Sequence, residues 1–478
     1  MITSERMSVV DANAEYLGVS ADKLMENAGA GVARAVERVT MGNPEKEITV
    51  FAGKGNNGGD AFVAARFLQE YDPKVYLLGR SSGIHTETAR DNYEALVGSG
   101  VDVEEVRDSS QVPDVDADVV LDGVLGTGVS GGLREPVSTA VEAINSSDSE
   151  IVSVDIPTGV DPDTGKGSER VEADTVVTFH DFKPAHTEID ANVDVVDIGI
   201  PDAAEEFVGE GDLQLLGRDP DSHKGDNGKV LVVGGGPYTG APTLTATAAL
   251  RAGCDWVTVA APESVAETVQ SYSPNLIVRE LDGERLSPEN VEYVSQLADG
   301  HDTVVVGPGL GDADETVEAA AEILREVESA VVDADAIRSL SQVETSGKEV
   351  IATPHAGELS SLGVDVPDSW EKRKDVVERF ADKEGITVLL KGRYDVVSDG
   401  ETTRVSRTGN PGMTVGGTGD VLAGVCGFLL SELDSLDAAG IGGFVNGRAG
   451  DLAYEDEGNG LVATDVVECL PEAMRQYN

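Results

Sequence analysis

Short apolar runs alternate with helical patterns in the first part of the chain. Residues 21–39 carry apolar side chains at helical spacing. The apolar runs are rich in β-branched residues, end near Gly, Asp or Pro, and lie at residues 48–53, 74–79, 117–123, 150–157, 174–179 and 193–199. Such runs, separated by helices, are typical of parallel strands buried on both faces. The pattern predicts an α/β domain whose ligands lie at the carboxyl ends of the strands.

A second α/β pattern begins after a stretch in which the apolar runs lapse and Asp, Gly and Pro accumulate. We place the boundary in that stretch, with one domain at residues 1–215 and the other at residues 216–478. A helix is expected at residues 243–253, and a glycine-rich turn at residues 416–420 opens a long apolar helix. Further strand-forming runs lie at residues 229–236, 256–262, 303–311, 330–336, 349–358 and 386–397. The two halves do not repeat each other, so two different domains are predicted.

Composition and charge narrow the possible functions. The chain has 478 residues, 40% of them hydrophobic, and a formal net charge of −53. The acidic residues are spread along the chain, which favours adaptation to high intracellular salt over a single cationic partner, because a partner would need a concentrated patch. Nucleic-acid binding is not expected, since neutralising phosphates requires clustered Lys and Arg. No run approaches the length that spans a membrane.

The cysteines and the N-terminal segment bear on location. Cys254, Cys426 and Cys469 lie far apart without a CxxC pair, so we expect buried thiols rather than disulfides or a metal site. The N-terminal segment has no apolar signal-peptide core. We therefore expect a cytoplasmic protein, and we also expect it to form a homo-oligomer.

Three predicted strand ends in the first half carry oxygen-bearing side chains, namely Asn57, Asp122 and Thr158. Because the carboxyl ends of parallel strands meet at one edge of a sheet, we expect these side chains to lie together. Neutral oxygens and one carboxylate suit a hard cation, and backbone N–H groups nearby remain for a phosphate. The alternative is that Asn57 and Asp60 only stabilise a turn, while Asp122 and Asp155 cap helices.

Two common phosphate-loop motifs were compared with the glycine-rich segments at residues 126–131 and 54–60, one with each segment. Gly126, Gly128 and Gly131 satisfy the spacing GxGxxG, which alone is weak evidence for a dinucleotide site. No helix follows directly, because Pro136 opens the next one, so this is a poor Rossmann dinucleotide loop. Lys54 precedes the earlier glycine-rich turn and no GK[ST] follows, which argues against a Walker A loop.

Taken together, these segments resemble the NAD(P)H-hydrate epimerase family. The resemblance rests on GKGNNGGDAF, LDGVLGTGVSGGLREP, VDIPTGVDPDTG, LMENAG and TFHDFKPAH. It implies a Rossmann-like three-layer domain that interconverts the two C6 epimers of hydrated NADH or NADPH. It also implies that Asp155 transfers protons and that Asn57, Asp122 and Thr158 bind K⁺. Thr158 stands where the family often has Ser, and Ala61 where many members have Gly.

The same resemblance implies a set of substrate contacts in the first domain. One positioned carboxylate can move the protons that accompany inversion at C6. The implied contacts are Asn56, Asn57, Gly58, Gly59, Asp60, Gly126, Thr127, Gly128, Val129, Ser130, Gly131, Gly132, Asp155 and Lys183.

In the second half the turn GGTGD presents backbone N–H groups to an anion at the start of a helix. Asp420 lies in this turn, and a carboxylate beside a phosphate is unfavourable unless it accepts the proton of an attacking hydroxyl. The alternative is an ordinary acidic residue in a first helical turn. Lys391 ends a predicted strand, where it can reach phosphates. His355 on its own is more often a structural residue.

These pieces resemble ADP-dependent NAD(P)H-hydrate dehydratase, which implies a ribokinase-like fold. The resemblance rests on HKGDNGKVLVVGG, YTGAP, GPGLG, DADA, TPHAGE, LLKG and GNPGMTVGGTGDVLAG. It implies that ADP, with Mg²⁺, phosphorylates the substrate hydroxyl, with Asp420 as the base, and that phosphate then leaves. Asp395 stands where many members have Thr. The implied substrate contacts are Ala241, Gly309, His355 and Asp420, and the implied nucleotide contacts are Lys391, Gly392, Arg393, Tyr394, Asp395 and Gly419.

Two other functions were weighed against a bifunctional repair enzyme. A ribokinase-type kinase with an accessory domain would not need the NNGGD and DIPTG segments. A non-catalytic scaffold or RNA-binding protein fits neither the net charge of −53 nor the presence of Asp155. We therefore interpret the chain as an enzyme that epimerises hydrated NAD(P)H and dehydrates the S form while ADP is cleaved to AMP and phosphate.

Overall fold

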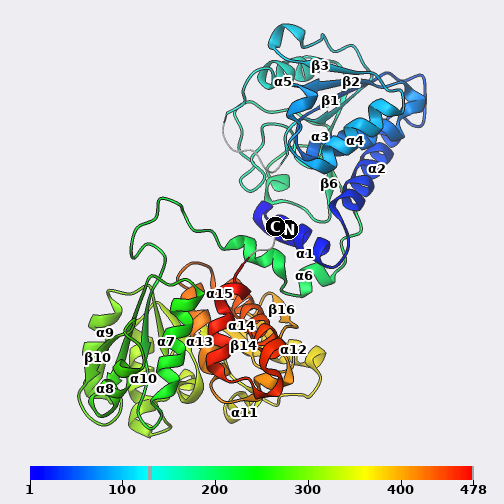
Figure 1. Ribbon diagram of the computed structural model, residues 1–478. Coiled ribbons are helices and arrows are strands. Elements are labelled where there is room, and N and C mark those ends of the chain that lie inside the picture. Colours follow the sequence, from blue (N-terminus) through cyan, green and yellow to red (C-terminus); the bar gives the residue numbers. More distant parts are fainter. Residues whose placement is uncertain (127–131, 476–478) are drawn as a thin grey trace. The chain divides into compact units, whose positions relative to one another are not determined.

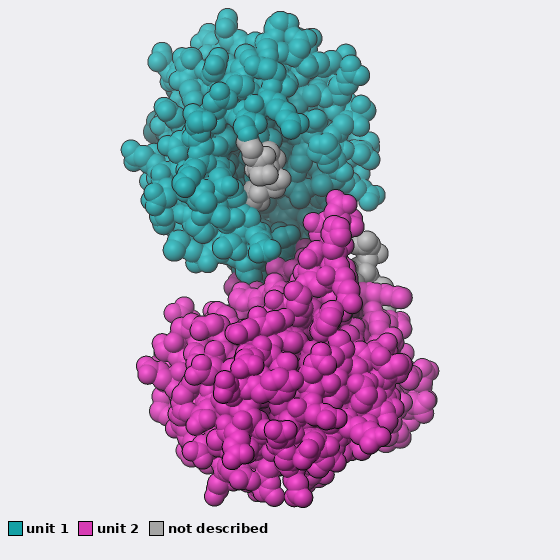
Figure 2. Space-filling view, turned by 90° about the vertical axis from the view of Figure 1, so that its left-hand side faces the viewer, with its two compact units in different colours: residues 1–202 teal, residues 203–478 magenta. Residues whose placement is uncertain are grey.

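Two compact units make up the chain, Met1–Asp202 and Ala203–Asn478 (Figure 2). The computed structural model describes residues 1–126 and 132–475. Five of the predicted substrate contacts, Thr127 to Gly131, lie outside the described residues. Within those ranges no helix is both long enough and apolar enough to cross a membrane.

The first unit is built on a seven-stranded sheet in which all neighbouring strands run parallel. Its order is β3-β2-β1-β4-β5-β6-β7, so the chain changes its direction of travel between β1 and β4. In such sheets ligands bind at this switch point, outside the carboxyl ends of the strands. The strands are β1 (Ile48–Ala52), β2 (Lys74–Leu78), β3 (Val103–Val106), β4 (Val119–Gly123), β5 (Glu150–Val154), β6 (Thr175–Phe179) and β7 (Asn192–Val196).

Helices cover both faces of this sheet (Figure 1). Phe51 of β1 belongs to the apolar cluster formed by α5, whereas a Cβ on Gly123 of β4 would lie 2.6 Å from Ala61 of α3, on the other face. Helix α2 begins and ends where the sequence predicts, and the predicted three-layer class is confirmed. The helices are α1 (Ser4–Tyr16), α2 (Ala21–Val39), α3 (Asn56–Phe67), α4 (Glu87–Gly98) and α5 (Val137–Asn145).

The second unit has a nine-stranded sheet of order β10-β9-β8-β11-β12-β13-β14-β15-β16. Strands up to β14 pair in parallel, and β14, β15 and β16 pair antiparallel, so the run at 386–397 forms a hairpin rather than one strand. The strands are β8 (Lys229–Val233), β9 (Trp256–Pro262), β10 (Ile277–Leu281), β11 (Thr303–Val306), β12 (Ser329–Val332), β13 (Glu349–Ala352), β14 (Thr387–Leu390), β15 (Asp395–Ser398) and β16 (Thr403–Ser406).

Two helical layers enclose this second sheet. Buried residues of α7, α13, α14 and α15 form one apolar core, and those of α9, α10 and α12 form another. The helices are α6 (Ala203–Glu206), α7 (Gly240–Ala252), α8 (Glu263–Tyr272), α9 (Val291–Ala298), α10 (Asp314–Glu326), α11 (Ala356–Ser361), α12 (Trp370–Glu384), α13 (Thr418–Leu429), α14 (Ser435–Glu457) and α15 (Ala463–Ala473).

The boundary between the units lies between Asp202 and Ala203, earlier than the predicted position after residue 215. Residues 203–215 belong to the second unit because they pack on β16. Val208 N donates to Val405 O at 3.0 Å, and the buried Arg404 and Asp212 form an ion pair. This attachment depends on contacts distant in sequence, so the polar composition of the segment did not reveal it.

Two candidate active sites

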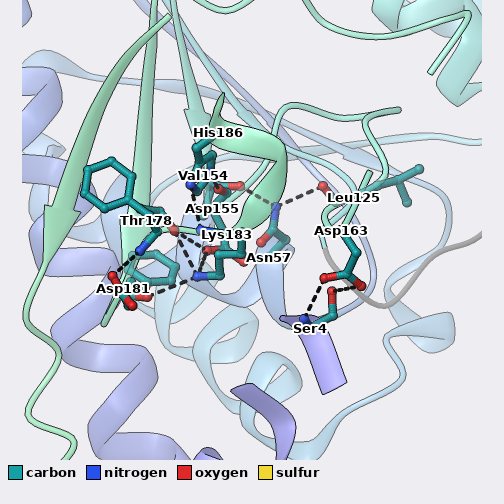
Figure 3. A network of polar contacts seen from close by, with 12 residues as sticks. Ser4, Asn57, Leu125, Val154, Asp155, Asp163, Thr178, Asp181, Lys183 and His186 are labelled. Atoms are coloured by element: carbon teal, nitrogen blue, oxygen red, sulfur yellow. Dashed lines mark hydrogen bonds and ion pairs between the residues drawn. The ribbon is translucent and has the colours of Figure 1, made fainter. Parts of the chain in front are cut away.

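Asn57 joins three strand ends of the first unit. It lies in the first turn of α3, directly after β1. Its Nδ2 donates to Val154 O at 2.8 Å, at the end of β5, and to Leu125 O at 3.1 Å, just after β4 (Figure 3). Asn57 therefore braces the switch point of the sheet rather than only its own turn. A Cβ on Gly126 would lie 2.7 Å from Asn57 Oδ1, so the segment after β4 passes over this amide.

Asp122, on β4, is fully buried and accepts four hydrogen bonds. Its Oδ1 accepts from Thr158 Oγ1 at 2.6 Å and Val124 N at 3.3 Å, and its Oδ2 accepts from Ser153 Oγ at 2.8 Å and Thr158 N at 2.9 Å. Burial raises the pKa of Asp122, although these donors oppose the shift. Asn57, Asp122 and Thr158 thus meet at one sheet edge. Their amide, carboxylate and hydroxyl oxygens are of the chemical type that binds K⁺. A carboxylate has about four positions that accept hydrogen bonds, and the four bonds to Asp122 already occupy them.

Asp155 and Lys183 form a buried pair beside this edge. Lys183 follows β6 and is 1% exposed, and its Nζ donates to Asp155 Oδ1 at 2.6 Å, to Thr178 Oγ1 at 2.9 Å and to Phe179 O at 3.0 Å (Figure 3). Asp155 has φ of 62°, a left-handed conformation that costs energy for a residue with a side chain. Such strain, held by surrounding bonds, is characteristic of functional positions.

His186 ties together the backbones of this pair. Lys183 N donates to His186 Nδ1 at 3.0 Å, and His186 Nε2 lies 3.0 Å from Asp155 O. Because Nδ1 accepts a backbone N–H, the proton must sit on Nε2, which donates to the Asp155 carbonyl. Burial lowers the pKa of His186, which favours this neutral tautomer. His186 stands in the TFHDFKPAH segment, but its role could not be read from the sequence.

Two further carboxyl groups face the Asp155–Lys183 pair. Asp60, on α3, is buried, and burial followed by repulsion from Asp155 raises its pKa well above the usual value, while Lys183 partly opposes this. Asp11, on α1, has its pKa raised to about 6 by burial, against attraction from Lys183 and with added repulsion from Asp155. Asp11 could not be identified from the sequence because no motif marks it.

Helix α1 is fastened to the loops that carry this site. Ser4 N and Oγ donate to Asp163 Oδ1 and Oδ2 at 2.9 and 3.0 Å (Figure 3). The amino group of Met1 lies 2.8 Å from Asp181 Oδ2. Asp163 follows β5 and Asp181 follows β6, so α1 belongs to the site although it is distant in sequence.

In the second unit, Lys391 and Asp333 form the charged centre of the site. Lys391 Nζ lies 2.8 Å from Asp333 Oδ1 and 4.0 Å from Glu358 Oε2, and Thr353 Oγ1 donates to the same Asp333 oxygen at 2.7 Å. Burial lowers the pKa of Lys391, but Asp333 and Glu358 raise it more, so the net shift is upward. The ammonium group therefore stays charged at the strand end, where it could pair with a phosphate.

Asp420 lies in the first turn of α13 without capping that helix by its side chain. Thr245 Oγ1 donates to Asp420 O at 2.9 Å and to Ala241 O at 3.1 Å, which joins the starts of α13 and α7. Burial, then repulsion from Asp333, raises the pKa of Asp420 to about 7, partly offset by Lys391. A carboxyl group that titrates near neutrality is well suited to act as a general base.

Residues 391–395 form the turn of the hairpin after β14. Gly392 N donates to Asp395 Oδ1 at 2.9 Å, and burial raises the pKa of Asp395 to about 6, partly offset by this bond and by Lys391. A Cβ on Gly419 would lie 3.4 Å from Lys391 Nζ, so the start of α13 meets the hairpin turn. The implied nucleotide contacts therefore lie close together.

The remaining implied substrate contacts occupy neighbouring strand ends. A Cβ on Gly309, after β11, would lie 3.3 Å from Ala241 Cβ, so these two residues are adjacent. His355 caps α11, because its Nδ1 accepts from Gly357 N at 2.9 Å and from Glu358 N at 3.2 Å. The structural role considered for His355 is thus present, and its Nε2 lies 3.5 Å from Glu358 Oε1 in the same cap.

Two family descriptions match the two units separately. Residues 21–185 match the family described as YjeF-related protein N-terminus. Residues 230–472 match the family described as NAD(P)H-hydrate dehydratase. Helix α1, with Asp11, lies outside both matched ranges.

Relatives match nearly the entire chain. The bifunctional NAD(P)H-hydrate repair enzyme Nnr of Archaeoglobus fulgidus is 46% identical over 477 residues, which cover 99% of this chain and 98% of that protein. The chain belongs to this family. The protein of the same name from Methanothermobacter thermautotrophicus is 44% identical over 491 residues, covering 98% and 94%. Among solved structures, one similar chain is ADP/ATP-dependent NAD(P)H-hydrate dehydratase from Bacillus subtilis, co-crystallised with ATP and Mg²⁺. It is 24% identical, with a TM-score of 0.48, and the match covers 56% of this chain and 97% of that chain.

Membership of the NAD(P)H-hydrate repair family confirms the predicted pairing of an epimerase with a dehydratase. The roles of individual residues stay predictions, which the geometry above makes specific. Asp155 with Lys183, and Asp333 with Lys391, are the charged centres of the two units.

Proposed function

We propose that this chain repairs hydrated NADH and NADPH with two active sites, one in each unit. The first unit interconverts the R and S forms, and the second dehydrates the S form while ADP is cleaved to AMP and phosphate. The observation that carries this proposal is family membership over nearly the full length, together with a charged centre at the carboxyl ends of the strands in each unit.

Epimerisation requires the C6–O bond to break and water to add to the other face of the ring. One group must give a proton to the departing hydroxyl, and another must take a proton from the incoming water. Asp155, paired with Lys183, is the proposed acceptor, and Asp60, whose pKa is raised by burial, is the proposed donor. The two groups can exchange roles for the reverse direction. Asn56 to Asp60 and the segment from Gly126 to Gly132 are proposed to bind the dinucleotide.

K⁺ is proposed to bind at the edge formed by Asn57, Asp122 and Thr158. The amide oxygen of Asn57 and nearby carbonyls would contact the ion, and the charge of the hydrogen-bonded Asp122 would balance it. When bound, K⁺ would neutralise substrate phosphate charge. Among the described residues, no group of three or more His, Cys, Asp or Glu side chains could hold a metal ion.

In the second unit, Asp420 is proposed to take the proton of the C6 hydroxyl as that oxygen attacks the β-phosphoryl group of ADP. AMP departs, the C6 phosphate ester then loses phosphate together with a proton from C5, and the C5–C6 double bond returns. Lys391 and the N–H groups at Gly419 offset the phosphate charge. Mg²⁺ would enter with the diphosphate, mainly on phosphate oxygens, and supply further charge neutralisation.

Assembly and location are part of this proposal. A homo-oligomer is expected, and light scattering after gel filtration measures it. A reducing, cytoplasmic environment suits Cys254, Cys426 and Cys469, which are free thiols with Cys254 and Cys426 buried.

The test uses separated R and S forms of hydrated NADH and NADPH with ADP, Mg²⁺ and K⁺. Restored absorbance of the reduced nicotinamide is expected from both forms. Asp420→Asn should abolish restoration of the S form but leave epimerisation intact. Asp155→Asn should abolish epimerisation but leave restoration of the S form intact. Loss of both activities from either change would contradict two independent sites, and no restoration by the wild-type chain would exclude the function.

A further inference from the structure

The turn between β1 and α3 has the geometry of a dinucleotide-binding turn. Gly53, Gly55 and Gly58 have the spacing GxGxxG, the turn follows β1 directly, and α3 begins at Asn56. This is the structural context that gives the spacing its meaning.

The three glycines have different surroundings, as expected for a dinucleotide-binding turn in which two glycines allow close packing and one lets the ligand approach the backbone. A Cβ on Gly53 would lie 1.8 Å from Val124 O, and one on Gly58 would lie 2.1 Å from Gly53 O, so both positions are closely packed. A Cβ on Gly55 would meet no atom within 4 Å. The open side at Gly55 leaves room for a pyrophosphate to approach the backbone at the start of α3.

Strand order then determines where each half of a dinucleotide lies. Asp155 follows β5, so the reacting nicotinamide lies on the β4–β5 side of the switch point. With the pyrophosphate at the start of α3, the adenosine must extend to the other side, over β1 and β2. The adenosine ribose therefore approaches the loop that follows β2.

The loop after β2 carries an Arg at the place where NAD-binding proteins of this topology carry an Asp or Glu. Arg80 follows β2 and is exposed, and residues 79–84 contain no Asp or Glu. A Cβ on Gly79 would lie 2.8 Å from Lys54 Cδ, so the Lys54 side chain lies along the same loop. The neighbouring Glu105 is engaged in holding the loop, because its Oε1 accepts from Ser81 N at 2.9 Å and Ser81 Oγ at 2.7 Å.

Both cations are available to a ligand. Within residues 1–126 and 132–475, neither the Arg80 guanidinium nor the Lys54 ammonium group has a hydrogen bond or ion pair. A guanidinium group can hold a phosphate through two parallel hydrogen bonds. An Arg in this loop accommodates a ribose 2′-phosphate, whereas an Asp or Glu there binds the 2′-hydroxyl.

We propose that Arg80 and Lys54 bind the 2′-phosphate of hydrated NADPH, so that the epimerase site prefers the phosphorylated dinucleotide to hydrated NADH. This specificity rests on the proposed epimerase function of the first unit. It concerns the adenosine end of the substrate and leaves the chemistry at C6 to Asp155 and Lys183.

The experiment measures kcat/KM for the R forms of hydrated NADPH and hydrated NADH separately. Variants are Arg80→Ala, Arg80→Glu and Lys54→Ala, and the matched control is Lys74→Ala, which removes one exposed charge at the opposite end of β2. Arg80→Ala should lower kcat/KM for the NADPH form by about 10- to 100-fold, mainly through KM, and leave the NADH form nearly unchanged. Arg80→Glu should reverse the preference, and Lys74→Ala should leave the ratio unchanged.

Equal losses for both substrates in Arg80→Ala, or no preference in the wild-type chain, would overturn the proposal. A calorimetric titration with adenosine 2′,5′-bisphosphate separates it from the proposed function, with excess ADP and Mg²⁺ occupying the second unit. If the wild-type chain binds adenosine 2′,5′-bisphosphate and Arg80→Ala does not, the result would support the 2′-phosphate site, even if the chain shows no epimerase activity. Equal binding by both would overturn it.

Discussion

Replacing Lys183 by Met tests whether the buried Asp155–Lys183 pair stabilises the first unit. Methionine has a similar length but no donor, so three acceptors lose the Lys183 ammonium group: Asp155 Oδ1 at 2.6 Å, Thr178 Oγ1 at 2.9 Å and Phe179 O at 3.0 Å. Lys183 is 1% exposed and Asp155 is 8% exposed, so water replaces few of these bonds. The carboxylate of Asp155 is left as a buried charge without its cation.

The expected loss follows from this burial. Removing one partner of a buried ion pair costs about 3–5 kcal/mol. For a unit of roughly 200 residues, 1 kcal/mol corresponds to about 2–4 °C, so the Tm of the first unit should fall by roughly 6–20 °C. The double variant Lys183→Met/Asp155→Asn should recover at least about 1 kcal/mol, because it removes the unpaired charge.

Thermal unfolding of the full chain can follow each unit separately. Both tryptophans, Trp256 and Trp370, lie in the second unit, so their fluorescence reports that unit alone, whereas far-UV circular dichroism reports both. In Lys183→Met the dichroism transition that belongs to the first unit should move to lower temperature. The fluorescence transition, which reports the second unit, should stay at the same temperature. A shift of both transitions, or no recovery in the double variant, would refute the reasoning.

Other predictions concern pH and ions. The carboxylate of Asp420 must be ionised to accept a proton, so kcat/KM for dehydration of the S form should fall about tenfold per pH unit below about pH 7, and a profile flat between about pH 5 and 9 would exclude Asp420 as the base. Burial raises the pKa of Asp11 to about 6 in the folded protein, above its ordinary value, so Asp11 reduces stability as the pH rises from that ordinary value through about 6. Asp11→Asn should therefore stabilise the first unit at pH 8 but not at pH 3, as urea unfolding can measure; equal shifts at both would contradict the assignment. Asn57→Ala should remove any advantage of KCl over NaCl in epimerisation, and an unchanged ratio would place K⁺ elsewhere.

Much of each site could be predicted from the sequence because its residues stand directly after predicted strands. The runs that predicted strands contain β1, β4 and β5, and Asn57, Asp122 and Asp155 stand at or just after their carboxyl ends. Asp11 and His186 could not be assigned in this way. Asp11 lies on a helix before the first strand, and the role of His186 depends on which backbone groups surround its ring.

By itself the sequence indicated most of the strands, their alternation with helices, the glycine-rich turns and the family, because hydrophobic spacing and turn chemistry are local properties, but it indicated neither β3 nor β10. Only the tertiary structure decided the strand order, the switch point between β1 and β4, and the attachment of residues 203–215 to β16. The bond from Asn57 to Val154 spans 97 residues, and that from Ser4 to Asp163 spans 159. Such contacts arise from the burial of whole sheets and helices, and the local spacing of apolar residues does not specify them.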